Sequence, residues 1–525
     1  MVRTNSERFG SHDAVADGDL LWSFADVERE MVRVARSLIA CGVEPGDRVG
    51  IWAPNSAAWI TAALGALAAR AWLVPLNTRL KGDEASYILR KTDARLLFLA
   101  DGFLDTDYSG SLRRAAPDLR ALANIVELSV SSGGLDSPAW MEFLKRGDDI
   151  PQDRVEASIE AGSPEDISDI IFTSGTTGTP KGVMLRHGAS LRGYEVFGEH
   201  FGLQANHRYV LPTPFFHCFG YKAGWMLSLM TGAVAFPIAV FDALVVLELI
   251  AREAITHMPG PPTMFSALLD HPQRAEFDLS SLGYAIIGAA SIPAVLVRRM
   301  RDELDIARIL SAYGLTENHA LATLTSPDDS PDVVATTVGR PLPDIEMRLV
   351  DDSGQEVAAG NEGEVLLRGP FLFSGYYDDA EATDRTLVNG WLHTGDVGRF
   401  DKEGHVQITD RKKDMFIVGG FNVAPAEVEK TIMAMPGVSE VAVVGMMDEY
   451  FGEVGAAFVI LREGAHVSSI DVITYAREHL ANFKVPRRVE IVEALPMNAT
   501  GKVVKTELRR RLEILNRASE RAVQE

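Results

Sequence analysis

Apolar residues in the first part of the chain follow two alternating spacings. Over residues 24–41 and again over 57–69 they recur every three or four positions, which predicts two helices. Short apolar runs at 47–52 and 72–75 predict two buried strands. Helices that alternate with strands in this way indicate βαβ units and a largely parallel sheet. The same pattern recurs from about residue 166 to about residue 315.

The pattern changes twice towards the C-terminal end. Residues 346–350 and 363–368 are strand-like runs on either side of a turn at 351–354, which predicts an antiparallel meander in a small barrel-like subdomain. The second change falls near residue 410, and a proline at the first turn opens a predicted helix over 425–435. Further strands and helices are predicted at 438–444, 458–461, 469–480, 488–492 and 508–525.

These patterns predict an α/β fold with two domains. A large N-terminal domain over 1–410 combines mixed, largely parallel sheets and helices with the barrel-like subdomain. A smaller α+β domain over 414–525 follows it. A length of 525 residues agrees, since it exceeds what one compact core accommodates.

Charge and cysteine content narrow the function. The net charge of −22 opposes non-specific binding to nucleic acid or to anionic lipid surfaces. The longest apolar stretches, 59–76 and 233–251, are interrupted by charged residues or proline, so we expect no stable membrane insertion. The two cysteines, Cys41 and Cys218, lie far apart, which favours the reducing cytoplasm, and Cys218 is expected to be a small buried apolar residue. Peripheral membrane contact and a homodimer both stay open.

A loop rich in glycine and hydroxyl groups follows a predicted strand at 169–172. Its glycines let backbone N–H groups approach phosphate oxygens, and Lys181 adds a positive charge after Pro180. The common P-loop has its lysine followed by serine or threonine, whereas Gly182 follows here. A flexible surface turn is the alternative. The residues predicted to bind phosphate are Thr173, Ser174, Gly175, Thr176, Thr177, Gly178 and Lys181.

This loop resembles the signature of the adenylate-forming superfamily, which includes acyl-CoA synthetases, peptide-synthetase adenylation domains and firefly-type luciferases. The likeness extends from residues 21–24 to Lys505. It implies that ATP activates a small-molecule carboxylic acid as an acyl-adenylate, with release of pyrophosphate.

The resemblance also assigns roles in the nucleotide site. It implies that Tyr313 stacks on adenine beside Gly314, that Thr316 binds the α-phosphate and that Glu317 holds Mg²⁺. An oxygen ligand suits this hard cation. Gly288, Ala289 and Ala290 would line adenine and the acyl group.

A second group of residues follows from the same resemblance. Asp396 would hold both ribose hydroxyls and Arg411 would contact the ribose, while 411–413 would form a hinge. Lys502 would enter from a mobile C-terminal domain and bridge the carboxylate and the nucleotide phosphate during adenylation. After rotation about the hinge, Gly419 and Gly420 would line the approach of the thiol.

The segment around His217 favours the acyl-CoA synthetase branch. The resemblance places His217 beside the carboxylate, and the segment lacks the aspartate that binds the ammonium of an amino acid in peptide synthetases. The predicted catalytic residues are Lys502, His217, Thr316 and Glu317. No carrier domain follows, so coenzyme A is the expected acceptor.

The nature of the acid is less defined. Aromatic and small residues near 219–225 and at 288–290 favour a hydrophobic acid. Segments 215–224 and 259–263 are similar to actinobacterial ligases that activate the propanoate side chain of steroid-ring remnants. Activation of a steroid-derived or aryl acid, adenylation for a carrier protein, a luciferase-like oxygenase and a silent nucleotide-binding scaffold are the alternatives.

Overall fold

The computed structural model describes residues 1–524 except 118, 120, 121, 123, 130–134, 136, 174–178, 289–291, 293, 412, 413, 463 and 497–502. The chain forms two compact units. The large unit comprises 1–78, 85–172 and 182–410, and the small unit comprises 79–84, 173–181 and 411–525.

A nine-stranded sheet in the large unit has the order β15-β14-β13-β12-β11-β9-β10-β1-β2. Its central strands pair in parallel, while β14 and β15 at one edge and β2 at the other pair antiparallel. The strands are β1 (Asp13–Asp17), β2 (Leu20–Ser23), β9 (Arg208–Leu211), β10 (Val234–Pro237), β11 (His257–Gly260), β12 (Tyr284–Ile287), β13 (Arg308–Tyr313), β14 (Thr323–Leu324) and β15 (Arg340–Pro341).

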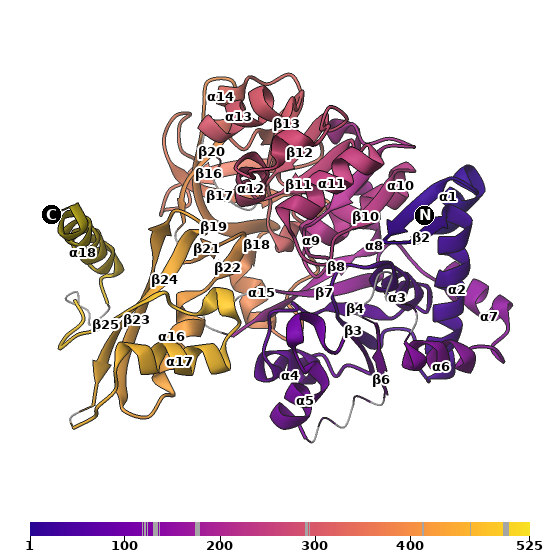
Figure 1. Cartoon of the computed structure of the whole chain (residues 1–525), viewed down its shortest axis with the longest axis horizontal. Helices are drawn as coiled ribbons and strands as arrows, with labels where there is room; N and C mark the ends of the chain where they lie inside the picture. The colour runs from indigo at the N-terminus through magenta and orange to yellow at the C-terminus, as the bar shows by residue number, and fades with distance from the viewer. Residues whose placement is uncertain are drawn as a thin grey trace. The chain divides into compact units, whose positions relative to one another are not determined.

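A second sheet of six strands has the order β6-β5-β3-β4-β7-β8, with parallel pairing from β6 to β7. Its strands are β3 (Arg48–Trp52), β4 (Trp72–Pro75), β5 (Leu96–Leu99), β6 (Asn124–Glu127), β7 (Ile167–Thr173) and β8 (Lys181–Arg186). Helices α2 (Phe24–Ala40) and α3 (Ala57–Ala68) pack side by side (Figure 1). The predicted alternation of these helices with β3 and β4 is confirmed, because apolar faces at helical spacing are buried between the sheet and its neighbours.

A five-stranded sheet forms the barrel-like part of the large unit. β16 (Glu346–Val350) pairs antiparallel with β17 (Gly363–Arg368), as the turn between them predicts. The order continues through β19 (Trp391–Phe400) to β18 (Leu387–Val388), and β20 (Val406–Arg411) pairs with β19.

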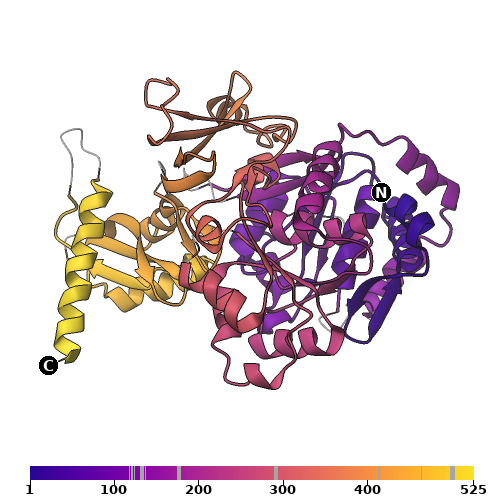
Figure 2. The same ribbon diagram turned by 90° about the horizontal axis from the view of Figure 1, so that it is seen from above.

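The small unit has its own sheet, of order β22-β21-β24-β23, and β25 pairs in parallel with β24. The strands are β21 (Phe416–Val418), β22 (Phe421–Val423), β23 (Val438–Asp448), β24 (Gly452–Leu461) and β25 (Arg488–Ile491). The helices are α16 (Pro425–Met433), which begins at a proline, α17 (Ser469–His479) and α18 (Lys505–Gln524). Leu508 and Leu512 of α18 pack against Ala442 and Val444 of β23, so the helix lies along this sheet (Figure 2).

The remaining helices connect these strands. They are α1 (Val2–Phe9), α4 (Gly82–Lys91), α5 (Tyr108–Ala115), α6 (Pro138–Arg146), α7 (Gln152–Glu160), α8 (His187–Phe201), α9 (Cys218–Gly220), α10 (Leu227–Thr231), α11 (Ala243–Glu253), α12 (Pro262–Leu269), α13 (Ala294–Leu304), α14 (Pro331–Thr336) and α15 (Ala380–Thr386). Single turns lie at η1 (Phe103–Asp105), η3 (Arg274–Glu276), η4 (Thr316–Asn318) and η5 (Asn482–Lys484), and η2 (Tyr221–Met226) is a π-helical turn. Among the described residues, no helix combines the length and apolarity that crossing a bilayer requires.

Candidate active site

The glycine-rich loop lies between two adjacent strands. Thr173 is the last residue of β7 and Lys181 is the first residue of β8. The predicted strand at 169–172 is confirmed within β7, and Asp169 and Ile170 are fully buried there. Ser174, Gly175, Thr176, Thr177 and Gly178 lie outside the described residues.

Two predicted nucleotide residues meet between the sheets of the large unit. The hydroxyl of Tyr313, at the end of β13, donates a hydrogen bond of 2.7 Å to Oδ2 of Asp396 on β19. The next residue must be glycine, because a Cβ on Gly314 would lie 2.3 Å from the carbonyl carbon of Ala320. The aromatic ring and the carboxylate are therefore held in one place, although they are 83 residues apart in the sequence.

Thr316 and Glu317 lie in the short turn η4, directly after this contact. The hydroxyl of Tyr376 donates a 2.7 Å hydrogen bond to Oε1 of Glu317. Burial, followed by the charge of Glu317, raises the pKa of Tyr376, so its hydroxyl keeps the proton that it donates. The backbone N–H of Phe373 also donates to the carbonyl of Glu317. A carboxylate oriented in this way suits a hard divalent cation.

His217 follows β9 and precedes the short helix α9. Desolvation by the surrounding protein lowers the pKa of His217 to about 4, so the imidazole is neutral at neutral pH. Its neighbour Cys218 is buried, and burial raises the pKa of the thiol to about 12. The expectation that Cys218 is a buried apolar residue is confirmed.

The aromatic residues after His217 divide into two groups. Phe219 is partly exposed, and its ring lies 3.7 Å from the position that a Cβ on Gly288 would take. Tyr221 and Trp225 are buried instead, stacked on each other with ring centroids 4.9 Å apart and edge-on to Trp59. Gly288 and Phe219 thus share one surface. Ala289 and Ala290 lie outside the described residues.

The predicted residues of the small unit are only partly described. Arg411 is the last residue of β20. Gly419 and Gly420 form the two-residue turn between β21 and β22, with φ of 55° and 89°, values that glycine adopts without steric strain. Lys502 and the hinge residues 412 and 413 lie outside the described residues.

The sequence did not single out Tyr376 or a buried ion pair between Asp169 and Lys222. The signal for the pair was present, since Lys222 is a lone charged residue within an apolar run and Asp169 opens the predicted buried strand at 169–172. An unpartnered charge is expensive to bury, so two such residues in one domain predict a pair.

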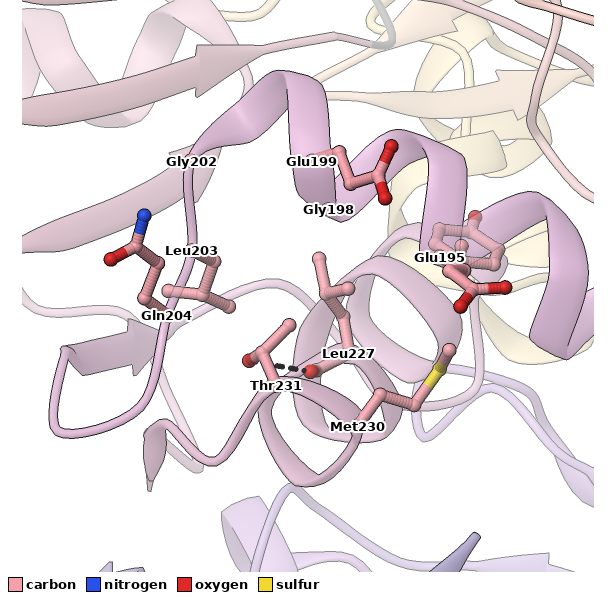
Figure 3. Close-up of a pocket in the computed structure, with 10 residues that line it drawn as sticks. Glu195, Gly198, Glu199, Gly202, Leu203, Gln204, Leu227, Met230 and Thr231 are labelled. Atoms are coloured by element: carbon pink, nitrogen blue, oxygen red, sulfur yellow. Dashed lines mark hydrogen bonds between the residues drawn. The ribbon is translucent and has the colours of Figure 1, made fainter.

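Two other features of the large unit involve none of the predicted residues. A cavity of about 400 Å³ lies between α8 and α10, and its lining includes Glu195 and Glu199 of α8 and Leu227 and Met230 of α10 (Figure 3). Thr231 also lines this cavity.

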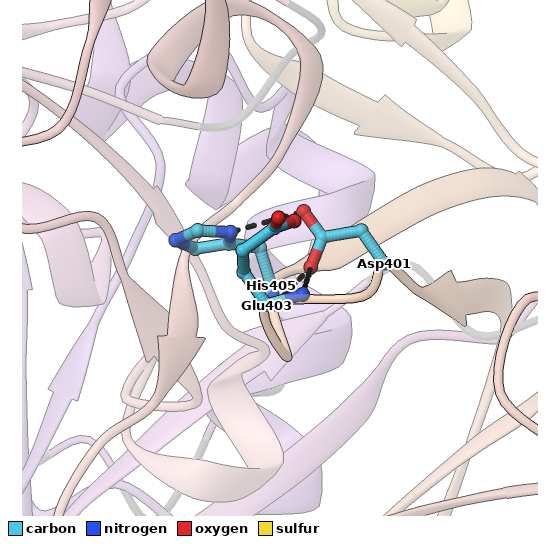
Figure 4. A group of neighbouring side chains, drawn as sticks. All are labelled: Asp401, Glu403 and His405. Atoms are coloured by element: carbon cyan, nitrogen blue, oxygen red, sulfur yellow. Dashed lines mark hydrogen bonds and ion pairs between the residues drawn. The ribbon is translucent and has the colours of Figure 1, made fainter.

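Asp401, Glu403 and His405 bring one possible metal ligand each into a turn between β19 and β20 (Figure 4). Oδ1 of Asp401 accepts the N–H groups of Glu403 and His405, and Oδ2 lies 3.0 Å from Nδ1 of His405. These hydrogen bonds close the turn, and this explains why the three side chains lie together.

Comparisons with known proteins agree with this geometry. The AMP-binding enzyme family model matches residues 2–377, and the model of the AMP-binding enzyme C-terminal domain matches 427–502. A 3-[(3aS,4S,7aS)-7a-methyl-1,5-dioxo-octahydro-1H-inden-4-yl]propanoyl:CoA ligase of Mycobacterium tuberculosis is 48% identical over 95% of both chains. The ligase of the same name from Rhodococcus jostii is 44% identical over 97% of both chains.

Solved structures show the same likeness. The amide bond synthetase McbA of Marinactinospora thermotolerans is 30% identical with a TM-score of 0.84, covering 97% of this chain and 99% of its own. A fatty acyl CoA synthetase of Mycobacterium tuberculosis is 31% identical with a TM-score of 0.70, covering 97% of both chains. The fold, the motifs and these relatives together imply ATP and coenzyme A as co-substrates and a carboxylic acid as substrate. The chain therefore belongs to the AMP-binding enzyme family, the adenylate-forming superfamily, as an AMP-forming acyl-CoA ligase.

Proposed function

We propose that this ligase activates the propanoate side chain of a bicyclic, oxygenated ring system derived from a steroid. The observation that carries the proposal is the identity of 48% and 44%, over nearly full length, to two ligases named for such an indane propanoate. The position of the Phe219 ring near Gly288 supports it, because an aromatic ring beside a residue without a side chain leaves an apolar surface for a flat ring system.

The residues described above have defined tasks in this reaction. A carboxylate oxygen of the acid attacks the α-phosphorus of ATP, and pyrophosphate leaves. Tyr313 stacks on adenine, Asp396 accepts hydrogen bonds from the ribose hydroxyls, and neutral His217 orients the attacking carboxylate. Glu317 would hold Mg²⁺, which would supply charge neutralisation at the phosphates. Thr316 and Lys181, with the N–H groups of the glycine-rich loop, contact the phosphates.

The second half-reaction uses the same acyl-adenylate. The thiol sulfur of coenzyme A attacks the acyl carbon, the bond to AMP breaks and the thiol proton passes to solvent. The C-terminal domain, 414–525, rotates about a hinge at 411–413, which withdraws Lys502 and brings Gly419 and Gly420 to the thiol. One site thereby serves two steps through a rearrangement of domains.

A panel of acids tests the substrate. We expect kcat/KM for the dioxo-indane propanoate to exceed that for octanoate or benzoate by about 100-fold, because an alkyl chain or a single ring fills less of an apolar surface shaped for a flat bicyclic system. AMP release would be measured with ATP and coenzyme A present. Equal kcat/KM for octanoate and the bicyclic acid would contradict the proposed substrate, while acid-dependent AMP release by either confirms the ligase activity.

Replacing Tyr376 with phenylalanine tests the metal role of Glu317. The change removes the hydroxyl that orients Oε1 and keeps the buried ring. We expect the Mg²⁺ concentration for half-maximal adenylation to rise roughly 10-fold, the lower end for loss of an outer partner of a metal ligand. Tyr108→Phe is the matched control, because its buried side chain carries a hydroxyl that donates to the carbonyl of Thr78 and not to a carboxylate. An unchanged Mg²⁺ dependence in Tyr376→Phe would argue against Glu317 as the ligand.

A further inference from the structure

A buried ionic network lies between three elements of the large unit. Nζ of Lys222, in the π-helical turn η2, donates to Oδ2 of Asp169 on β7 at 2.8 Å and to the hydroxyl of Ser190 on α8 at 2.7 Å. It also lies 4.8 Å from the ring centre of Tyr221. The side chains of Lys222 and Asp169 are 1% and 0% exposed. The two opposite charges therefore lie in direct contact with each other and are shielded from solvent.

Stability alone is a weak reason for such a pair. Desolvation of two buried charges costs several kcal/mol, and a well-packed apolar pair in their place is often equally stable or more so. The helix that carries Lys222 is also irregular, since Gly224 has ψ of −108° within the π-helical turn. Turns of this kind are frequent at functional sites. We therefore consider whether the ion pair holds the elements around it in fixed positions.

Each partner of Lys222 lies on an element that leads to a site residue. Asp169 is four residues before Thr173 on the same strand, and η2 begins four residues after His217. The hydroxyl of Ser168 donates to Oδ2 of Asp169 at 2.5 Å and also lies 3.1 Å from the carbonyl oxygen of Leu185 on β8, the strand that begins at Lys181. The network thus joins both strands that flank the glycine-rich loop to the segment of His217.

The turn with Thr316 and Glu317 is connected to the same network. Helix α8 carries Ser190 and, one turn later, Tyr194, whose hydroxyl donates to the carbonyl of His319 at 2.8 Å. Burial lowers the pKa of His319, and the nearby charge of Lys222 lowers it further. The elements of the phosphate, carboxylate and metal positions therefore share one buried support.

We propose that Lys222 is a positioning residue for adenylation, which through Asp169 and Ser190 fixes strand β7 and helix α8 relative to the segment of the carboxylate-orienting His217. The inference rests on the proposed roles of the glycine-rich loop and of His217. In-line attack needs the reacting oxygen and phosphorus within near-contact distance, so a shift of one support relative to the other lowers the rate steeply. The later attack of the thiol does not involve the loop, since pyrophosphate has already left.

The test compares Lys222→Met, Asp169→Asn and the double variant. We expect Lys222→Met to lower the unfolding midpoint, because Asp169 is left buried without its partner. Its kcat for adenylation, measured as acid-dependent exchange of pyrophosphate into ATP, should fall roughly 30-fold, within the loss that a misplacement of about 1 Å produces. The double variant should regain the unfolding midpoint and remain slow in adenylation. In the double variant, the rate of thioester formation from supplied acyl-adenylate should stay within about threefold of the wild-type rate.

Two further variants keep the comparison interpretable. Arg274→Met removes a partly exposed ion pair with Glu303 on α13, so its adenylation rate per folded molecule should be unchanged. Ser190→Ala removes one hydroxyl, folds if Lys222→Met does not, and should slow adenylation more than thioester formation. Recovery of both midpoint and adenylation in the double variant, or equal loss of both half-reactions in Ser190→Ala, would overturn the inference. Absence of exchange in the wild type would instead count against the proposed function.

Discussion

Replacement of Lys502 by alanine should slow adenylation by about 10²–10³-fold, the usual scale for loss of one preorganised charged partner of a transition state. The ammonium group is expected to bridge the attacking carboxylate and the phosphate, where two negative groups must approach each other. Formation of the thioester from supplied acyl-adenylate should be largely retained, because no such approach occurs in that step. Single-turnover measurements of each half-reaction would separate the two rates.

Lys505 provides a matched control in the same segment. Its Nζ donates to Oε1 of Glu429 at 2.8 Å, so this lysine is committed to an ion pair within the small unit. Lys505→Ala should lower stability slightly and leave both half-reactions close to wild type. Equal losses of adenylation and thioester formation in Lys502→Ala would show that the lysine acts in both steps, and the proposed withdrawal of the C-terminal domain would lose its main support.

The sequence predicted helices and strands well where the apolar residues followed a single helical or strand-like spacing. The strand at 72–75 and the helix beginning at residue 425 coincide with β4 and α16, because an apolar run between turns and a proline at the first helical position are local signals. Helix α1 was not predicted. Its inner face buries Asn5, whose amide donates to the carbonyl of Met230 at 3.0 Å, so apolar spacing does not reveal it.

The candidate site was predictable as a set of motifs and not as a geometry. The pairing of Tyr313 with Asp396 depends on how β13 and β19 are placed in the fold, which no local pattern encodes. The partners of Lys222 likewise come from a strand and a helix 53 and 32 residues away. Tertiary packing decides which buried charged residues become partners. The sequence therefore revealed the motifs of the site but not the ion pair that supports them.

Replacement of Asp396 by alanine should lower kcat/KM for ATP by about 10²–10³-fold, with the change mainly in KM. Two hydrogen bonds from the ribose hydroxyls to a carboxylate would be lost, and each hydrogen bond to a charged group contributes about 1.5–3 kcal/mol. Tyr313→Phe retains the ring that stacks on adenine and loses the 2.7 Å hydrogen bond to Asp396, so kcat/KM for ATP should fall by less than about tenfold. ATP titrations at saturating acid would measure both effects.

Asp401 is the control on the same hairpin, because it closes the turn after β19 and has no predicted contact with the nucleotide. Asp401→Ala should lower the unfolding midpoint while KM for ATP stays unchanged. If Asp396→Ala and Asp401→Ala raise KM for ATP equally, the effect of Asp396 arises from a disturbed hairpin and the ribose assignment is wrong. If 2′-deoxy-ATP is a poor substrate for wild type but matches ATP in Asp396→Ala, the carboxylate is the group that recognises the ribose diol, because only a direct partner can remove that discrimination.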